Sequence, residues 1–335
     1  MDCNLNPGCT TKAPASHRPR LTRRAALCAA TISASCGRIL PKGPKPRVQI
    51  VRAEYDQDLY SIVRRILVDS KLDIKDRRVV LKPNLVEFDR HTAINTHPLV
   101  VHAVLEAVRS LGASHVLIAE GPGHRRVTWD LAEDAGYFKE IPRFEQSFVD
   151  LNIDKLREVQ IPNPHSALRS LYLPTTVLAA DLLISIPKLK THHWAGTTLS
   201  MKNLFGIVPG GVYGWPKNVL HWAGIAESIA DLHKLIPQHF CVVDGIVGME
   251  GNGPIQGEPK AAGILVAGAD MPAVDATCCR VMKIDPAQIA YLQLTSSNGQ
   301  TNAERVIQTG ESITSVAQEF KLLPALEPLR LRASS

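Results

Sequence analysis

Short apolar runs alternate along most of the chain with longer stretches in which apolar residues recur at helical spacing. The runs have the length of buried strands, and the stretches between them have the period of amphipathic helices. This alternation predicts an α/β fold: a mainly parallel sheet with helices on both faces, in a single large domain or two closely fused α/β lobes. The expected strands are Val48–Arg52, Val79–Lys82, His115–Ala119, Asp181–Ile186, Phe240–Val243 and Gly263–Ala267. The expected helices are Leu59–Val68, Leu99–Leu111, Trp129–Ala135, Gly224–Leu235, Met271–Met282 and Pro286–Leu294.

The first residues follow a different pattern. A basic segment precedes the weakly apolar run Ala25–Ala34, and small residues follow where a signal peptidase could cut. The pair Arg23 and Arg24 resembles the twin-arginine export motif. We therefore expect residues 1–36 to be a signal peptide that engages the twin-arginine export machinery, which places the protein in the periplasm or another extracytoplasmic space. A disordered basic tail is an alternative, and a lipoprotein anchor at Cys36 is disfavoured because Ser33 suits it poorly.

The rest of the chain divides into three expected parts. Residues 37–47 contain the Pro/Lys/Gly stretch "PKGPKPR" and are predicted to be a linker. Residues 48–299 hold the strand and helix pattern and form the α/β domain. Residues 300–335 are predicted to be a helical C-terminal appendage, with a disordered tail over residues 325–335. No transmembrane segment is expected in the mature chain.

Charge and cysteine content exclude several classes of protein. The chain of 335 residues has a net charge of +6, but five arginines fall within the first forty positions, so the remainder is nearly neutral. With no zinc-finger spacing and no long basic helix, the sequence does not predict a nucleic-acid partner. The seven cysteines form no C-x-x-C pair and no disulfide framework, and three of them precede residue 36. The chain therefore has no iron–sulfur motif of its own.

Polar residues and glycines follow the expected strands where each strand ends. Because parallel strands place their carboxyl ends at one edge of a sheet, we expect these residues to converge on one cleft. The lysines predict an anionic ligand, and glycines let backbone amides approach it. The predicted ligand-binding residues are Lys82, Asn84, Glu120, Gly121, Gly123, Lys188, Lys190, Lys202, Asn203 and Gly210. Trp194, Tyr213, Trp215 and Trp222 could stack on a planar, nucleotide-like ligand, or could equally pack a loop over the cleft.

Three residues are candidates for acid–base chemistry. His192 can be a general base near neutral pH, and Asp244 or Glu250 would be its carboxylate partner. His192 and His193 are also candidate metal ligands, although no metal-binding spacing supports them. Successive side chains alternate faces on an extended segment, so we expect at most one of the two histidines to act.

Several motifs resemble one known family. In order they are "LKPNL", "THPLVV", "AEGPG", "PKLKTHHWAGTTLSMKNLFGIVPG" and "VVDGIVGMEGNGPIQGEP", and together they are similar to the domain-of-unknown-function family 362 (DUF362) over roughly Val48–Leu294. Members of that family commonly carry twin-arginine signals, and some are fused to ferredoxin-type iron–sulfur modules. The resemblance implies that an electron-transfer role for this chain would need an external iron–sulfur partner.

A fainter resemblance links one segment to the nickel-pincer lactate racemase family. The pattern H-x-x-A-G-x-x-x-x-x-K runs from His192 to Lys202. The resemblance implies that His192 is catalytic or binds metal and that Lys202 anchors the cofactor. This chain departs from that family because Ser200 and Met201 replace the glycine pair before the lysine.

These observations lead to two functional hypotheses. The first is an exported enzyme of unassigned chemistry that binds an anionic or nucleotide-like ligand, or a metal or nucleotide-derived cofactor, in a basic, glycine-rich cleft. Such an enzyme could be a redox-linked oxidoreductase, or it could resemble a racemase. The alternative is a noncatalytic cofactor-binding or carrier protein that uses the same cleft.

Overall fold

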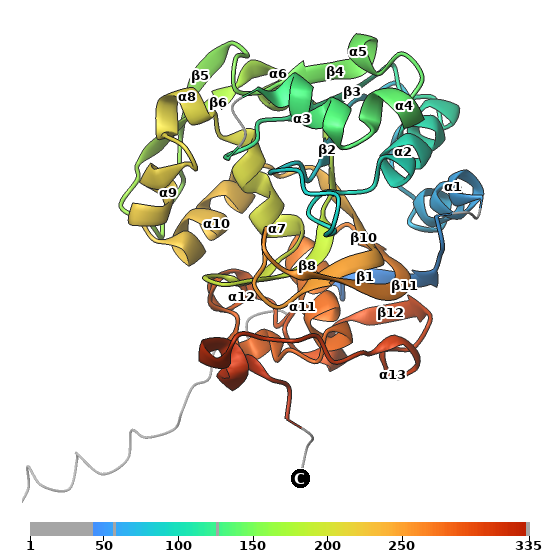
Figure 1. Cartoon of the computed structure of the whole chain (residues 1–335), viewed down its shortest axis with the longest axis vertical. Helices are drawn as coiled ribbons and strands as arrows, with labels where there is room; N and C mark the ends of the chain where they lie inside the picture. Colours follow the sequence, from blue (N-terminus) through green and yellow to red (C-terminus); the bar gives the residue numbers. More distant parts are fainter. Residues whose placement is uncertain (1–42, 56–57, 125–126, 333–335) are drawn as a thin grey trace, which may run out of the picture. The chain divides into compact units, whose positions relative to one another are not determined.

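The central element of the fold is a mixed, mostly parallel sheet. The computed structural model describes residues 43–55, 58–124 and 127–332, and within them the sheet has ten strands (Figure 1). The strands of this sheet are β1 (Arg47–Arg52), β2 (Arg78–Pro83), β3 (His115–Glu120), β4 (Phe148–Asp150), β7 (Leu182–Ile186), β8 (Lys188–His192), β9 (Gly196–Thr198), β10 (His239–Glu250), β11 (Glu258–Gly268) and β12 (Ile307–Gly310). A separate hairpin consists of β5 (Leu156–Gln160) and β6 (Ser170–Pro174).

The strand order places the parallel strands at one end of the sheet. The order is β12-β1-β11-β10-β7-β2-β3-β4, and β10, β7, β2, β3 and β4 pair in parallel with one another. β11 is antiparallel to both β1 and β10. β8 lies off this path, parallel to β10 and antiparallel to β9. The predicted α/β class with a mainly parallel sheet is therefore confirmed.

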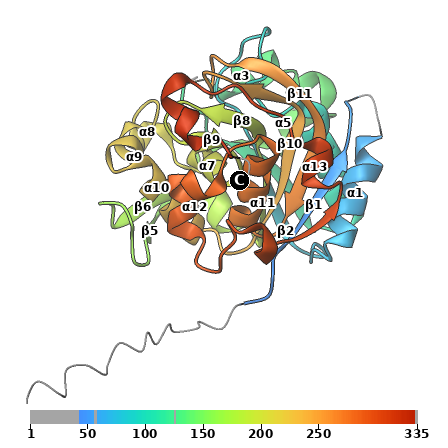
Figure 2. The same ribbon diagram turned by 90° about the horizontal axis from the view of Figure 1, so that it is seen from below.

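Helices cover both faces of the sheet. Along β2, Val80 packs into one hydrophobic core while Val79 and Leu81 pack into another, as expected for a strand buried on both sides. Figure 2 shows α1 on one side of the strands and α11 and α12 on the other. The α-helices are α1 (Leu59–Asp69), α2 (Pro98–Ser110), α3 (Thr128–Asp134), α4 (Tyr137–Glu140), α5 (Phe144–Ser147), α6 (Thr175–Leu178), α7 (Ser200–Asn203), α8 (Gly210–Tyr213), α9 (Asn218–Trp222), α10 (Ile225–Lys234), α11 (Met271–Val281), α12 (Ala290–Thr295) and α13 (Ile313–Val316). The 3-10 helices are η1 (Leu204–Ile207), η2 (Pro286–Gln288), η3 (Ala303–Arg305) and η4 (Pro324–Leu329).

Two expected elements differ from the structure. The helix predicted over Pro286–Leu294 is split into η2 and α12, because Ile289 between them has extended backbone angles. The strand predicted over Phe240–Val243 continues as β10 to Glu250. Glycine makes this continuation possible, since a Cβ on Gly248 would lie 2.5 Å from the carbonyl oxygen of Leu189 in β8. The glycine-rich stretch is therefore a strand against which β8 packs closely.

The segment predicted as a helical C-terminal appendage also contributes a strand to the main sheet. β12 joins the main sheet as a strand parallel to β1, and Phe320 is fully buried in the core. Residues 325–332, expected to be disordered, include the end of η4, and Arg330 forms a bridge with Ile284. Strand β1 has backbone groups on both sides to satisfy, and β12 pairs with the side that β11 leaves open.

The structure does not cover the N-terminal part of the predicted domain organisation. The predicted signal peptide, residues 1–36, and the first part of the predicted linker, residues 37–42, lie outside the described residues. Within those that are described, no helix combines the length and apolar character needed to cross a membrane.

Candidate functional site

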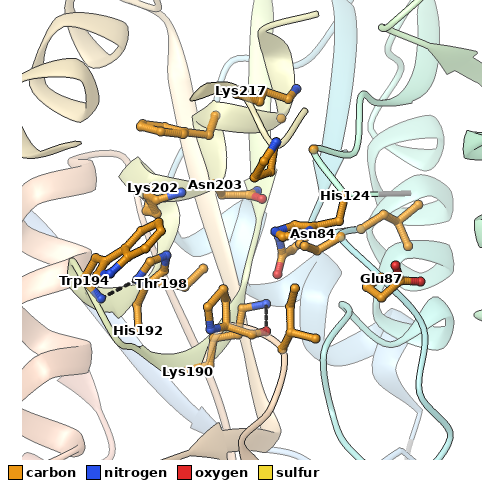
Figure 3. Close-up of a pocket in the computed structure, with 18 of the residues that line it drawn as sticks. Asn84, Glu87, His124, Lys190, His192, Trp194, Thr198, Lys202, Asn203 and Lys217 are labelled. Carbon is orange, nitrogen blue, oxygen red and sulfur yellow. Dashed lines mark hydrogen bonds between the residues drawn. The ribbon is translucent and has the colours of Figure 1, made fainter. Parts of the chain in front are cut away.

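A pocket with a cavity volume of about 720 Å³ lies at the carboxyl ends of β2 and β3. β8 and α7 form one of its walls, and loops after β2, β3 and β10 and around residue 217 complete it. Figure 3 shows Lys202, His192 and Trp194 on one side, with Asn84, His124 and Glu87 opposite them. Its position agrees with the rule that ligands bind at the carboxyl edge of a parallel sheet.

The pocket gathers most of the residues predicted to bind a ligand. Ten of the residues singled out from the sequence line it, although their roles stay predictions. They are Lys82, Asn84, Glu120, Gly121, Gly123, Lys190, His192, His193, Lys202 and Asn203.

A buried ion pair supports the floor of the pocket. The amine of Lys82 lies 2.5 Å from Glu120 Oε2, and both side chains are fully buried. The Glu120 carboxylate also accepts hydrogen bonds from the backbone N–H groups of Leu85 and Gly121. Asn203 donates to the Lys82 carbonyl oxygen at 2.9 Å. Burial lowers the pKa of Lys82, and the neighbouring Glu120 carboxylate opposes that shift. Because their charges compensate each other, this pair contributes little net charge to a ligand.

Three other lysines supply the positive character of the pocket. Lys190 donates to the carbonyl oxygens of Ile94 and Pro254, at 2.8 and 3.2 Å. Lys217 donates to the carbonyl oxygens of Gly121 and Val208. The Lys202 amine lies 3.8 Å from the centroid of the Phe205 ring, within the range of a cation–π contact. In the part of the chain that the structure describes, no carboxylate lies within ion-pair distance of these three amines.

Burial changes the protonation of these lysines. It lowers the pKa of Lys202 to about 7, and the charge on Lys82 acts in the same direction. Burial also lowers the pKa of Lys217 to about 7. The pKa of Lys190 is well below its usual range because the amine is buried and other lysines surround it. A bound anion would supply the opposite charge that is missing near these amines, and it would raise their pKa.

Both adjacent histidines line the pocket, whereas the alternation of an extended segment predicts that they point to opposite faces; that at most one of them acts stays a prediction. Their ring centroids are 4.9 Å apart. Strand β8 ends at His192, and the chain turns at His193 and Trp194, so the alternation of a strand does not continue through this pair. His192 Nδ1 accepts hydrogen bonds from the backbone N–H groups of Trp194 and Ala195.

Two buried polar atoms of the pocket lack a hydrogen-bond partner among the described residues. They are Asn84 Oδ1 and Thr198 Oγ1. A buried polar group without a partner costs roughly 1–3 kcal/mol. Because both atoms belong to residues that line the cavity, a bound ligand or water could satisfy them.

Four residues predicted to belong to the site do not line the pocket. Lys188 and Asp244 form a separate buried ion pair of 2.6 Å. Tyr55 donates to Asp244 Oδ1 at 3.0 Å, which completes that cluster. The register of β8 on β10 explains this placement, since Lys188 lies directly opposite Asp244.

The other two residues have structural contacts. Glu250 lies at the end of β10, 3.3 Å from the Lys260 amine, and accepts a hydrogen bond from the backbone N–H of Lys321. Gly210 donates its backbone N–H to Asn152 Oδ1 at 2.8 Å. The expected partnership of His192 with Asp244 or Glu250 is therefore not assembled.

The sequence prediction missed Lys217 as part of the pocket, which His124 and His221 also line. Lys217 follows the aromatic and glycine-rich stretch "YGWP" and adopts a left-handed backbone conformation with φ of 69°. A lysine in such a turn is usually a surface charge. The clustering of aromatic residues around it was the only signal that this loop covers a cavity.

The described residues of the pocket do not form a preassembled metal centre. Within residues 43–55, 58–124 and 127–332, no group of three or more His, Cys, Asp or Glu side chains could hold a metal ion. The expected metal-ligand role of His192 and His193 is therefore not supported by further protein ligands in that part of the chain.

Comparisons with known proteins give the following similarities. A family model described as Domain of unknown function (DUF362) matches residues 79–280. The protein named "Thylakoid-associated protein sll1697" from Synechocystis sp. is 30% identical over 263 residues, which cover 75% of this chain and 78% of that protein.

Two solved structures show a weaker similarity. The lactate racemase apoprotein from Thermoanaerobacterium thermosaccharolyticum has 15% identity and a TM-score of 0.43, and the match covers 72% of this chain and 58% of that chain. A protein from Thermotoga maritima has 14% identity and a TM-score of 0.41, with 68% and 59% covered. In both cases the match spans less than two thirds of the solved chain.

Proposed function

Because the chain belongs to the DUF362 family, whose description assigns no activity, we propose a function from its pocket: an enzyme that binds an anionic or nucleotide-like small molecule. The observation that carries this proposal is the set of three lysines, Lys190, Lys202 and Lys217, whose amines have no carboxylate within ion-pair distance among the described residues. Burying uncompensated cations is costly, so their arrangement is best explained by an anion that binds between them.

The pocket also contains groups that can move protons. With a pKa of about 7, a substantial fraction of Lys202 is a neutral amine at neutral pH, which is the form that acts as a base or a nucleophile. Unlike Lys82, Lys202 has no carboxylate partner in the described structure. These properties favour an enzyme over a passive anion site.

The lining also suits a nucleotide-derived cofactor. Lys190 and Lys202 would hold its anionic group, and Trp194 and Phe205 offer aromatic faces to a planar part. When bound, such a cofactor would supply the electron transfer of a redox-linked reaction, and an external iron–sulfur partner would be its electron donor or acceptor. The faint resemblance to the lactate racemase family supports Lys202 as the anchor of the cofactor.

We expect Lys202→Met to weaken anion binding about tenfold or more, because the variant removes a charged hydrogen-bond donor. The measurement is calorimetric titration with AMP, inorganic phosphate and succinate as probes. Lys155→Met, on an exposed side chain far along the chain from the pocket segments, is the matched control.

The pH dependence of the same titration provides a second readout. A bound anion raises the pKa of Lys202 and Lys217 above about 7, so binding takes up protons at higher pH. Affinity should therefore fall from about pH 7 to about pH 9, by up to roughly tenfold per pH unit for each proton taken up. Failure of all three probes to bind wild-type protein, or equal binding by Lys202→Met, would contradict the proposal.

A second candidate function is a noncatalytic carrier of a cofactor. It is favoured by one observation, that the carboxylates of Asp244 and Glu250 lie outside the pocket and leave His192 without the expected acid partner. A carrier would return its bound molecule chemically unchanged. Mass analysis of the ligand before and after incubation separates the two functions.

The location of the protein is a further part of the proposal. The signal-like residues 1–36 support export by the twin-arginine route. The name of the Synechocystis relative associates that protein with thylakoids. We expect the double variant Arg23→Lys, Arg24→Lys to accumulate in the cytoplasm of the native host, as measured by cell fractionation. Unchanged export of that variant would rule out this route.

A further inference from the structure

One nitrogen of the His192 imidazole, Nδ1, is hydrogen-bonded to the backbone. The N–H groups of Trp194 and Ala195 donate to Nδ1 at 3.0 and 3.2 Å. Backbone N–H groups can only donate, so Nδ1 must be unprotonated. A neutral imidazole carries one proton, which therefore sits on Nε2. The turn that follows β8 thus selects the tautomer of this histidine.

The surroundings of His192 keep the ring neutral. The side chain is almost fully buried, and the charged or titratable groups that affect it are Lys202, His193, Lys190 and His221. Burial, followed by the Lys202 charge, lowers the pKa of His192 well below its usual range. A second proton would have to displace two backbone hydrogen bonds at Nδ1 as well, so the imidazolium is disfavoured by geometry and by charge.

Two other histidines of the pocket have the opposite arrangement. His193 Nδ1 lies 2.7 Å from the Gly253 carbonyl oxygen, and His221 Nδ1 lies 3.0 Å from the Lys217 carbonyl oxygen. A carbonyl oxygen can only accept, so Nδ1 carries the proton in both rings. When these rings are neutral, their Nε2 atoms therefore have a free lone pair.

From these contacts we propose that His192 is a permanent neutral hydrogen-bond donor to an oxygen of the bound anion, and that His193 and His221 are the acceptors. The proposal rests on the anion-binding function proposed above, and it specifies which histidine donates a hydrogen bond to the ligand and which histidines accept one. His192 lines the pocket, and Nε2 is the nitrogen that the backbone contacts leave available to a ligand (Figure 3). A neutral imidazole donor can stabilise negative charge that develops on an oxygen.

This assignment changes the role that the sequence suggested for His192. A general base or a metal ligand needs a lone pair, and the lone pair at Nδ1 is already used by two backbone N–H groups. The base would instead be a group with an available lone pair, such as His193, His221 or the neutral amine of Lys202. The ligand that fits has an acceptor oxygen for His192 next to a donor for one of the other rings.

The tautomer can be tested on the free protein without any ligand. Nitrogen-15 NMR of the histidine side chains at neutral pH should show Nε2 of His192 protonated and Nδ1 unprotonated, with the reverse for His193 and His221 in their neutral forms. A His192→Asn variant assigns the His192 signals. An Nδ1–H tautomer or an imidazolium at His192 under these conditions would overturn the proposal, whether or not an anion binds.

The donor role is tested by the same variant. Asparagine can accept the Trp194 and Ala195 N–H groups through Oδ1, as side chains do in Asx turns, but cannot place a donor where Nε2–H was. We expect His192→Asn to keep the wild-type unfolding midpoint and to bind AMP about ten- to a hundredfold more weakly. His115→Asn, on an exposed side chain at the start of β3, is the control.

The outcomes separate this proposal from the proposed function. Wild-type affinity in His192→Asn would overturn the donor role while leaving anion binding intact. Absence of AMP, phosphate and succinate binding by the wild type would contradict the proposed function, and the NMR result would still decide the tautomer.

Discussion

Glu120→Ala is expected to lower the free energy of unfolding by about 3–5 kcal/mol, the typical cost of removing one partner of a buried ion pair. The Lys82 amine would be left buried without its carboxylate, which lies 2.5 Å away in the native protein. The backbone N–H groups of Leu85 and Gly121 would also lose their acceptor. Denaturant unfolding followed by circular dichroism measures the change, with the exposed Glu133→Ala as control.

The double variant Lys82→Met, Glu120→Leu distinguishes the cost of an unpaired charge from the value of the pair. Apolar replacements of similar volume often restore or exceed the stability of a buried ion pair. We expect the double variant to recover much of the stability lost in Glu120→Ala. A double variant as unstable as the single one would indicate that the hydrogen bonds to Leu85 and Gly121, rather than the charge pair, dominate.

Gly206→Ala is expected to destabilise the protein by about 1–3 kcal/mol or more, as overpacking of a core does, and to disrupt the pocket. A Cβ at this position would collide with Glu120 Oε1 and the Lys82 amine, and would lie 2.6 Å from Lys82 Cε. The buried pair would have to move, and with it the floor beneath Asn203. Unfolding midpoints and AMP titration measure the two effects.

Gly211→Ala is the matched control for this prediction. It lies in α8, and its added Cβ would meet only the Asn152 carbonyl oxygen, at 3.9 Å. We expect it to fold and bind as the wild type does. Equal stability of the two alanine variants would show that the ion pair can shift without cost and that Gly206 is not required for close packing.

The pattern of apolar residues was sufficient to predict the regular part of the fold. Runs such as Val79–Lys82 and Asp181–Ile186 are buried on both faces, and that burial leaves a continuous apolar signature. The pocket residues at the ends of β2 and β3 followed from topology, because all parallel strands end at one edge. Lys82, Glu120 and Lys190 were found in this way.

The rest of the candidate site depends on contacts between segments that are far apart in the sequence. The pattern of neighbouring residues does not show such contacts. Asp244 and Glu250 stand in a glycine-rich stretch typical of a loop, yet the glycines there allow β8 and β10 to approach each other closely. The stretch forms a strand, and its register pairs Asp244 with Lys188 instead of directing it at His192. Lys217 lies in the pocket only because of the path of its loop. Its burial could not be predicted from a sequence in which it has no charged neighbour.

Strand β12 affects the tendency of the protein to associate with other copies of itself. It covers the side of β1 that would otherwise present a row of free backbone N–H and carbonyl groups. Bare edges of this kind template pairing with other chains and lead to aggregation. β12 itself has only four residues and ends at Gly310, where φ of 76° turns the chain away. A short strand that ends in such a turn is a poor template, so the C-terminal stretch protects the sheet against edge-to-edge self-association.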